Sequence, residues 1–276
     1  MDAFEKYDTC VAALRTFAHQ AGFTECVIGL SGGIDSALCA VLCVDAFGAS
    51  SVHGVLLPGP YSSAHSVEDA EDEARTLGID YQVLSIVEPY QAFAELLAEP
   101  CGKAWDNLPS QNTQARCRMV CLMALSNAHG WMLVNTGNKS EAMMGYSTLY
   151  GDTAGAFAPI GGLYKTDVYT LSRARNERAR AAGLPEPIPT RVLVKPPSAE
   201  LAPGQEDESS LGIDYATLDA ILIRYFEWGW EVERIVSEGL SGSKNVSEVR
   251  QIIERAQRFA FKRALEPPYP SARFYD

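Results

Sequence analysis

The hydrophobic positions alternate between helical and strand-like spacing along the first half of the chain. Apolar residues recur at helical spacing over residues 3–21 and stop at Gly22, which predicts a helix that ends there. The pattern then predicts strand 26–30, a helix up to Gly48, strand 51–57, helix 65–77, strand 80–86, helix 110–128 and strand 131–135. Because the strands look buried on both faces and are separated by helices, we predict an α/β fold with a doubly wound parallel sheet and flanking helices. Ligands bind such sheets at the carboxyl ends of the strands.

The rest of the chain is less regular. Residues 87–109 show no clear pattern, and residues 145–165 are rich in Gly, Thr and Tyr, which is typical of a functional loop. A helix is predicted over 166–182. A proline-rich segment, 184–210, should be extended with a mobile acidic end. Helices are predicted near 215–227, 231–238 and 245–264.

Length and composition exclude several classes of protein. The 276 residues allow one large domain or two small ones. No repeat or sharp boundary divides them, so we predict one domain over 1–276, with a core of about 1–182 and a C-terminal loop and helical extension of about 183–276. The formal net charge of -12 argues against nucleic acid as a partner. No apolar run reaches the about 18 residues of a bilayer span, and the N-terminus lacks the order of a signal peptide. We therefore expect no membrane contact and a cytoplasmic location.

The seven cysteines are spread along the chain, which does not resemble a disulfide framework. The pairs Cys39/Cys43 and Cys117/Cys121 have the spacing of one helix face, but no His lies near to complete a metal site. We interpret them as small buried residues. The four histidines have no metal or triad spacing and are interpreted as structural or surface residues.

The most informative segment lies at a predicted strand-to-helix junction. It consists of Gly29, Leu30, Ser31, Gly32, Gly33, Ile34, Asp35 and Ser36. Its glycines allow backbone N–H groups to surround an anion, and the helix N-terminus adds partial positive charge, so the segment should bind phosphate. A P-loop has lysine where this loop has Asp35. An aspartate beside phosphates needs a cation between them, which indicates Asp35 as a Mg²⁺ ligand.

This loop resembles that of the N-type ATP pyrophosphatases, which cleave ATP to AMP and pyrophosphate while forming an adenylate. Four further segments resemble motifs of the NAD synthetase family within this superfamily, and the resemblance covers about residues 5–268. They are 112–119 (NTQARCRM), 135–141 (NTGNKSE), 145–152 (GYSTLYGD) and 195–201 (KPPSAEL). The details are closest to the synthetase domain of the glutamine-dependent enzymes, although we expect their N-terminal glutaminase domain to be absent, since only some 28 residues precede the loop.

The resemblance implies a set of site residues. Residues 29–36, Thr136, Lys165 and Ser198 would contact ATP. Asp35 and Glu141 would bind Mg²⁺, and Glu141 is also a candidate for contact with the second substrate. Deamido-NAD would be held by Asn112, Arg116, Glu141, Tyr146, Ser147, Thr148, Leu149 and Lys262. Asn112 and Arg116 are four residues apart on the predicted long helix, so they should share one polar face.

This chain departs from the free-standing ammonia-dependent enzymes at two places. Those enzymes usually have Lys at the position of Leu149 and Asp at the position of Ala156, so the substrate contacts here should follow the glutamine-dependent pattern. Their tail carries His-Lys where this chain has Phe261 and Lys262. The assignment of Lys262 is weaker for that reason.

The implied reaction is the ATP-dependent amidation of deamido-NAD to NAD⁺ by ammonia, with release of AMP and pyrophosphate. Catalysis would come from alignment and from positive charge, supplied by Mg²⁺ at Asp35 and Glu141, by Lys165 and by backbone amides. Asp152 is a candidate acceptor for the proton of ammonia, and it is equally well explained as a turn cap. The resemblance also implies a homodimer, and ammonia would come free or from a separate glutaminase chain.

Two alternatives remain open at this point. Another adenylating pyrophosphatase, such as a tRNA-modifying enzyme, should carry a basic strip or an RNA-binding domain, and the acidic sequence has neither. A nucleotide-binding module without catalysis should have lost Asp35, Lys165 or Glu141, and all three are present.

Overall fold

A four-stranded parallel sheet lies at the centre of the computed structural model, which describes all residues 1–276. The strands are β1 (Cys26–Gly29), β2 (Val52–Leu56), β3 (Asp80–Val83) and β4 (Met132–Leu133). Their spatial order is β3-β2-β1-β4, and every neighbouring pair is parallel. The predicted α/β fold is confirmed. The strand order changes direction between β1 and β4, which is where doubly wound sheets bind ligands.

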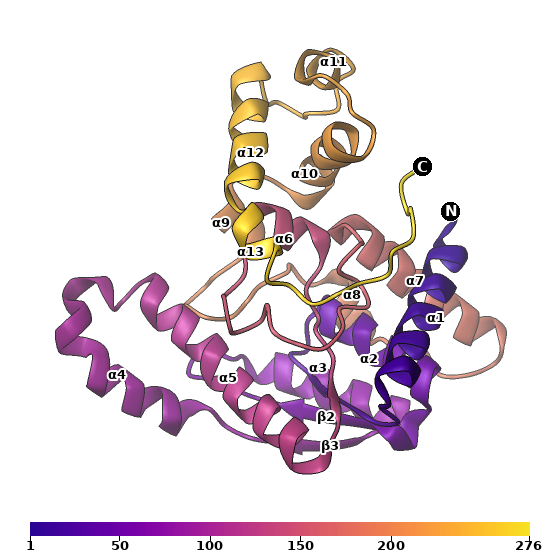
Figure 1. Cartoon of the computed structure of the whole chain (residues 1–276), viewed down its shortest axis with the longest axis vertical. Helices are drawn as coiled ribbons and strands as arrows, with labels where there is room; N and C mark the ends of the chain where they lie inside the picture. Colours follow the sequence, from indigo (N-terminus) through magenta and orange to yellow (C-terminus); the bar gives the residue numbers. More distant parts are fainter.

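Helices cover both faces of the sheet (Figure 1). One face packs against α1 (Ala3–Ala21), α2 (Ile34–Phe47), α3 (Ala64–Leu77) and α7 (Lys165–Ala181), and the other against α4 (Val87–Cys101) and α5 (Leu108–His129). β1 contributes to both layers, because successive side chains of a strand point to opposite faces. Cys26 and Ile28 join the larger core and Val27 joins the smaller one.

The burial of β3 differs from the prediction that the strands are buried on both faces. Asp80, Gln82 and Val83 are exposed, and only β2 pairs with this strand. β3 is the edge strand of the sheet, where one side of the backbone ladder faces outward. The alternation of elements predicted the strand correctly but could not predict its place at the edge.

Helix α4 occupies most of the segment 87–109, for which we predicted no regular structure. This helix was not predicted because prolines near both of its ends are usually unfavourable in a helix. Pro89 lies in the first turn, where N–H groups have no acceptor within the helix, and Pro100 is the residue before the last. Tyr90 is buried on the face that packs against the sheet, while Phe93 is exposed.

The C-terminal helices form a third layer that stands away from the sheet (Figure 1). They are α10 (Tyr215–Leu222), which continues into a π-helical turn (Ile223–Glu227), α11 (Val232–Ser237), α12 (Val246–Arg258) and α13 (Ala260–Arg263). The helices predicted near 215–227 and 231–238 are confirmed, and the one predicted over 245–264 is divided at Phe259 into α12 and α13. Their own core also includes Met143 and Met144 of α6 (Lys139–Met144), a helix that the sequence pattern did not predict.

The proline-rich segment contains two short helices, α8 (Thr190–Val194) and α9 (Asp207–Leu211). We predicted an extended path with a mobile acidic end. In the structure Asp207 is buried, and the side chain of Gln205 accepts a hydrogen bond from Leu201 N. Within the acidic end, Asp207 is therefore packed, whereas Glu206, Glu208, Ser209 and Ser210 are exposed.

Helix α1 and the C-terminal tail both contact α7. Nζ of Lys6 lies 2.9 Å from the carboxylate of Asp167, and the hydroxyl of Tyr275 donates to the same carboxylate. All seven cysteines are free thiols, and Cys39, Cys43 and Cys117 are buried. No helix is both long and apolar enough to cross a membrane.

Candidate active site

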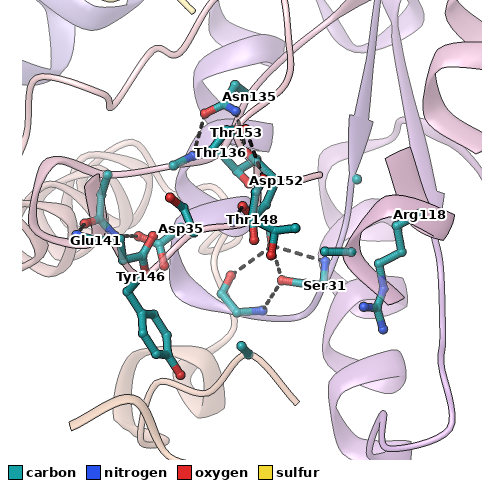
Figure 2. Close-up of a pocket in the computed structure, with 18 of the residues that line it drawn as sticks. Ser31, Asp35, Arg118, Asn135, Thr136, Glu141, Tyr146, Thr148, Asp152 and Thr153 are labelled. Atoms are coloured by element: carbon teal, nitrogen blue, oxygen red, sulfur yellow. Dashed lines mark hydrogen bonds between the residues drawn. The ribbon is translucent and has the colours of Figure 1, made fainter. Parts of the chain in front are cut away.

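One large cavity opens at the carboxyl ends of β1, β2 and β4, where the topology predicts it (Figure 2). Its volume is about 720 Å³, which is within the range of ligand sites. Every site residue predicted from the sequence lines this cavity except Gly32. Residues from five separate stretches of the chain, near positions 31, 116, 136, 150 and 200, therefore face one another.

The segment 31–36 forms a compact loop between β1 and α2. Ser31 N donates to Ser36 Oγ at 3.2 Å, and Gly33 N donates to Ser31 Oγ at 3.1 Å. Gly32 has a φ of 71°, and a β-carbon there would lie 2.1 Å from the carbonyl oxygen of Ser66. Only glycine fits at this position, because any side chain would collide with the start of α3. The loop thus places Gly33, the N-cap of α2, at the cavity.

Lys165 lies between two carboxylates at the floor of the site. Its Nζ is 2.5 Å from Asp35 Oδ2 and 3.0 Å from Glu141 Oε1, and its side chain is 1% exposed. Burial opposes the charged form of Lys165, but Asp35 and Glu141 outweigh it and raise its pKa above the ordinary value. The three residues come from the starts of α2, α6 and α7, so one ammonium group ties these helix ends together.

These carboxylates fit a magnesium ion that also binds substrate phosphates. Mg²⁺ in proteins usually takes one or two carboxylates and completes its shell with phosphate oxygens and water. Burial raises the pKa of Glu141 above its ordinary value, and Lys165 opposes this shift while Asp35 and Asp207 add to it. Oε2 of Glu141 makes no hydrogen bond in the structure, whereas Asn138 donates to Asp35 Oδ1 at 2.8 Å.

The loop 146–149 is held from both sides. Thr148 Oγ1 donates to Asn112 Oδ1 at 2.9 Å, and Arg116 Nε donates to the carbonyl of Leu149 at 3.1 Å. On the other side, Lys262 Nζ donates to the carbonyls of Gly145 and Ser147 at 2.8 and 2.6 Å. Asn112, Arg116 and Lys262 therefore shape the loop as well as lining the cavity.

Asp152 lies against the same loop at the wall of the cavity, where the residue is partly open to solvent. Its Oδ1 accepts a hydrogen bond from Thr148 N at 2.6 Å, so it does cap the turn. Burial raises the pKa of Asp152 to about 6, although this hydrogen bond and Lys262 favour its charged form. A carboxyl group that titrates near neutrality at a cavity wall has the properties of a proton acceptor. Capping and proton transfer are compatible here.

The segment 195–207 closes the cavity opposite the loop. Ser198 Oγ donates to the carbonyl of Gln205 at 2.5 Å. Glu200 has a φ of 48°, which is unusual for a residue with a side chain, and its carboxylate accepts from Ser63 N, Ser63 Oγ and Ser66 Oγ. Glu200 thereby fixes this segment to the N-terminus of α3 at a cost in backbone strain.

Sequence reasoning missed four residues of the site: Asn138, Asp207, Glu200 and Arg118. Asn138, Glu200 and Arg118 stand inside the motifs that we quoted, but a motif does not say which atoms meet. Asp207 lies in the acidic run that we interpreted as mobile. It is buried close enough to Lys165 for that ammonium to favour its charged form, while burial and Asp35 raise its pKa.

The chain is similar in sequence to a known family of proteins. A family model described as NAD synthase matches residues 6–266. The glutamine-dependent NAD(+) synthetase of Thermotoga maritima is 43% identical over 252 residues, which are 91% of this chain and 42% of that protein. The NH(3)-dependent NAD(+) synthetase of Methanosarcina acetivorans is 38% identical, with 98% and 99% covered.

A solved structure is similar over its whole length. The NMN synthetase of Francisella tularensis is 28% identical with a TM-score of 0.77, and the match covers 95% of this chain and 96% of that one. The chain spans about half the length of the glutamine-dependent relatives that it matches, for example 50% of the protein from Rhodobacter capsulatus. The family model matches most of the chain and the Methanosarcina protein is similar over nearly its full length, so the chain belongs to the NAD synthase family.

Proposed function

We propose that the protein converts deamido-NAD to NAD⁺ with ATP and ammonia, through an adenylated intermediate and with release of AMP and pyrophosphate. The observation that supports this most directly is that the loop 31–36 and the loop 146–149 face the same cavity. The first has the features of a phosphate site, and the second is framed by Asn112 and Arg116. One cavity can thus hold a triphosphate and a second substrate together.

The first half of the reaction needs alignment rather than a protein nucleophile. The nicotinate carboxylate attacks the α-phosphorus of ATP, the bond from this phosphorus to the bridging oxygen breaks, and pyrophosphate leaves. Backbone N–H groups of residues 31–36 bind the leaving group, and Thr136 and Ser198 line the wall beside it. Such contacts lower the barrier when they are stronger in the transition state than before it.

The charged cluster supports this step. Asp35 and Glu141 would hold Mg²⁺, which when bound supplies positive charge to the phosphate oxygens. Lys165 keeps the two carboxylates in place and adds its own positive charge at the start of α7. Asn138 fixes the second oxygen of Asp35.

The second half of the reaction replaces AMP by ammonia. Ammonia attacks the acyl carbon, the bond to AMP breaks, and one proton must leave the nitrogen. Asp152 is our candidate for the group that takes this proton, because its pKa of about 6 leaves it largely ionised at neutral pH. Ammonia is the direct nucleophile whether it arrives free or from a glutaminase.

The decisive experiment measures all products of the purified protein. With ATP, Mg²⁺, ammonium chloride and deamido-NAD we expect equal amounts of NAD⁺, AMP and pyrophosphate. Formation of ADP, or turnover of ATP that does not depend on deamido-NAD, would contradict the proposal. Glutamine in place of ammonium chloride shows whether this chain can use that nitrogen source.

A second candidate substrate is nicotinate mononucleotide. The observation that favours it is the similarity to the structure of an NMN synthetase. The chemistry at the carboxylate is the same, so only the adenylate half of the dinucleotide distinguishes the two acceptors. The ratio of kcat/KM for deamido-NAD to that for the mononucleotide decides between them, and we expect it to exceed one.

We also propose a homodimer in the cytoplasm, following the family resemblance. Sedimentation equilibrium of the purified protein tests the assembly, and a single species of 30.0 kDa would contradict it.

A further inference from the structure

The arginine at position 118 has no role in the chemistry described above, and its guanidinium is only partly satisfied. Arg118 lies on α5 and lines the cavity. Its one hydrogen bond runs from Nε to the carbonyl oxygen of Leu57 at 2.9 Å. Nη1 and Nη2 make no bond within the protein, and neither is sealed from the cavity. Two charged donors are thus left open to a ligand.

No carboxylate neutralises this charge. Glu200 and Asp152 are near enough to favour the charged guanidinium, but burial dominates and lowers the pKa of Arg118 below its ordinary value. Both oxygens of Glu200 are occupied by Ser63 and Ser66, and Asp152 accepts from Thr148. A half-buried guanidinium without an anionic partner is costly unless a ligand supplies one.

The strand register places this group beside the phosphate loop. Gly29 pairs with Val55 and Leu30 N donates to the carbonyl of Val55, so Ser31 and Leu57 follow directly at the adjacent ends of β1 and β2. Neighbouring strands are about 5 Å apart, and Arg118 is bonded to Leu57. In Figure 2 Ser31 lies between Arg118 on one side and Asp35 on the other. In this view Arg118 and the carboxylate of Asp35, which binds Lys165, lie on opposite sides of Ser31.

The turn after β2 fits closely around the guanidinium. A β-carbon on Gly59 would lie 2.8 Å from Nη2 of Arg118, so a residue larger than glycine would displace this group. Gln114, one helical turn before Arg118, donates to the carbonyl of Leu201 at 3.0 Å and fixes the neighbouring wall. The guanidinium is held in position before any ligand arrives.

We propose that Arg118 binds the phosphoryl group of the adenylate: the α-phosphoryl of ATP, which becomes the phosphate of AMP. The two outer phosphates would lie toward Asp35 and Lys165, and the inner one toward Ser31 and Arg118. Arginine forms paired, charge-assisted hydrogen bonds to phosphate. This proposal depends on the proposed adenylation for one point only: that the inner phosphate of ATP, and not an outer one, lies at Arg118. Arg118 would be a binding residue that stays in contact with the nucleotide through both halves of the reaction.

The test compares the binding of AMP with that of adenosine, because their ratio isolates the phosphoryl contact. Both are titrated calorimetrically into wild type, Arg118→Met, Arg118→Lys and Arg263→Met. Arg263 is the matched control, since it also bonds only to backbone carbonyls but does not line the cavity. We expect Arg118→Met to weaken AMP binding by about tenfold or more and to leave adenosine unchanged. Arg118→Lys should recover part of the loss, and Arg263→Met should change neither ligand.

Other results would overturn the proposal. If the ratio of the two affinities is the same in Arg118→Met as in wild type, Arg118 does not contact the phosphoryl group. If Arg118→Met loses affinity for AMP and for adenosine equally, the role of Arg118 is structural only. A loss confined to deamido-NAD, titrated in the same way, would assign the guanidinium to the second substrate. If Arg118→Met does not fold, the Arg118→Lys ratio decides alone. These measurements need no turnover, so failure of the proposed reaction would be seen separately.

Discussion

At the scale of single residues, the site depends on charges that are far apart in the sequence. Asp35 and Lys165 are separated by 130 positions, yet their charged atoms are 2.5 Å apart. The loop motif singled out Asp35 because its chemistry is local, and the structure shows that Asp35 lines the cavity. The contact of Lys165 with both Asp35 and Glu141 is a product of the fold, so no local pattern could reveal it.

Replacing Asp35 by Asn tests the charged cluster. We expect Asp35→Asn to reduce pyrophosphate release by about 10² to 10³-fold, since the site would lose the proposed cation ligand and the nearer carboxylate partner of Lys165. The amide has nearly the same shape, so far-UV circular dichroism should match that of wild type. A normal rate would show that Asp35 is not a magnesium ligand.

Asp152 predicts a dependence of activity on pH. Because burial raises its pKa to about 6, the carboxylate is protonated below this pH and cannot accept a proton from ammonia. The rate of amide formation should therefore fall as the pH is lowered through about 6. Asp152→Asn keeps an oxygen for Thr148 N and should lack this inflection. An inflection that persists in the variant would exclude Asp152 as the acceptor.

At the scale of elements, caps and periodicity predicted most helices and strands, while packing decided the rest. Gly22 ends α1 where the sequence predicts, and in the structure the side chain of Asp2 caps its start. Helix α4 was missed because Pro89 and Pro100 resemble breaks in the sequence, although only their positions at the two ends make them tolerable. The exposure of β3 follows from strand order, which a single sequence does not state.

The junction between α6 and the loop 146–149 should tolerate no side chain at Gly145. This residue has a φ of 64°, and a β-carbon there would lie 2.2 Å from the ring of Phe259. We expect Gly145→Ala to lower the free energy of unfolding by about 1–3 kcal/mol and to raise the KM for deamido-NAD more than that for ATP. Urea unfolding and initial rates measure the two effects. Gly22→Ala shares the positive φ but meets no atom within 4 Å, so it controls for backbone strain.

At the scale of the whole molecule, the C-terminal helices build their core partly on residues from the first 182 positions. Met143, Met144 and Tyr164 belong to the core of the C-terminal layer although they precede residue 182. We therefore propose that the chain is one folding unit, in keeping with the single domain predicted from its sequence. Trp105 and Trp131 lie in the sheet region and Trp228 and Trp230 in the C-terminal layer. The unfolding transitions that the fluorescence of these two tryptophan pairs reports should coincide. Two separate transitions would contradict the proposal.

Asp219 joins these layers and gives the stability of the molecule a dependence on pH. It accepts from Ser140 Oγ of α6 and from Thr166 N of α7. Burial raises its pKa to about 6, so its protonated form stabilises the fold below the unfolded value near 4. That contribution is lost as the pH rises through about 6. Relative to wild type, Asp219→Asn should gain up to about 3 kcal/mol of unfolding free energy between pH 4 and pH 7. A constant difference over this range would contradict the assignment.

The middle of helix α5 has a consequence for altering substrate choice. Alternate polar side chains of this helix bind different segments. Asn112 and Arg116 contact the loop 146–149. Gln114 donates to the carbonyl of Leu201, and Arg118 donates to the carbonyl of Leu57. Helix α5 therefore sets the distance between the loop 146–149 and the segments that contain Leu57 and Leu201. Redesign for a different acceptor is best confined to the tip of the loop, at Leu149, because any substitution that tilts the helix would spoil nucleotide recognition at the same time.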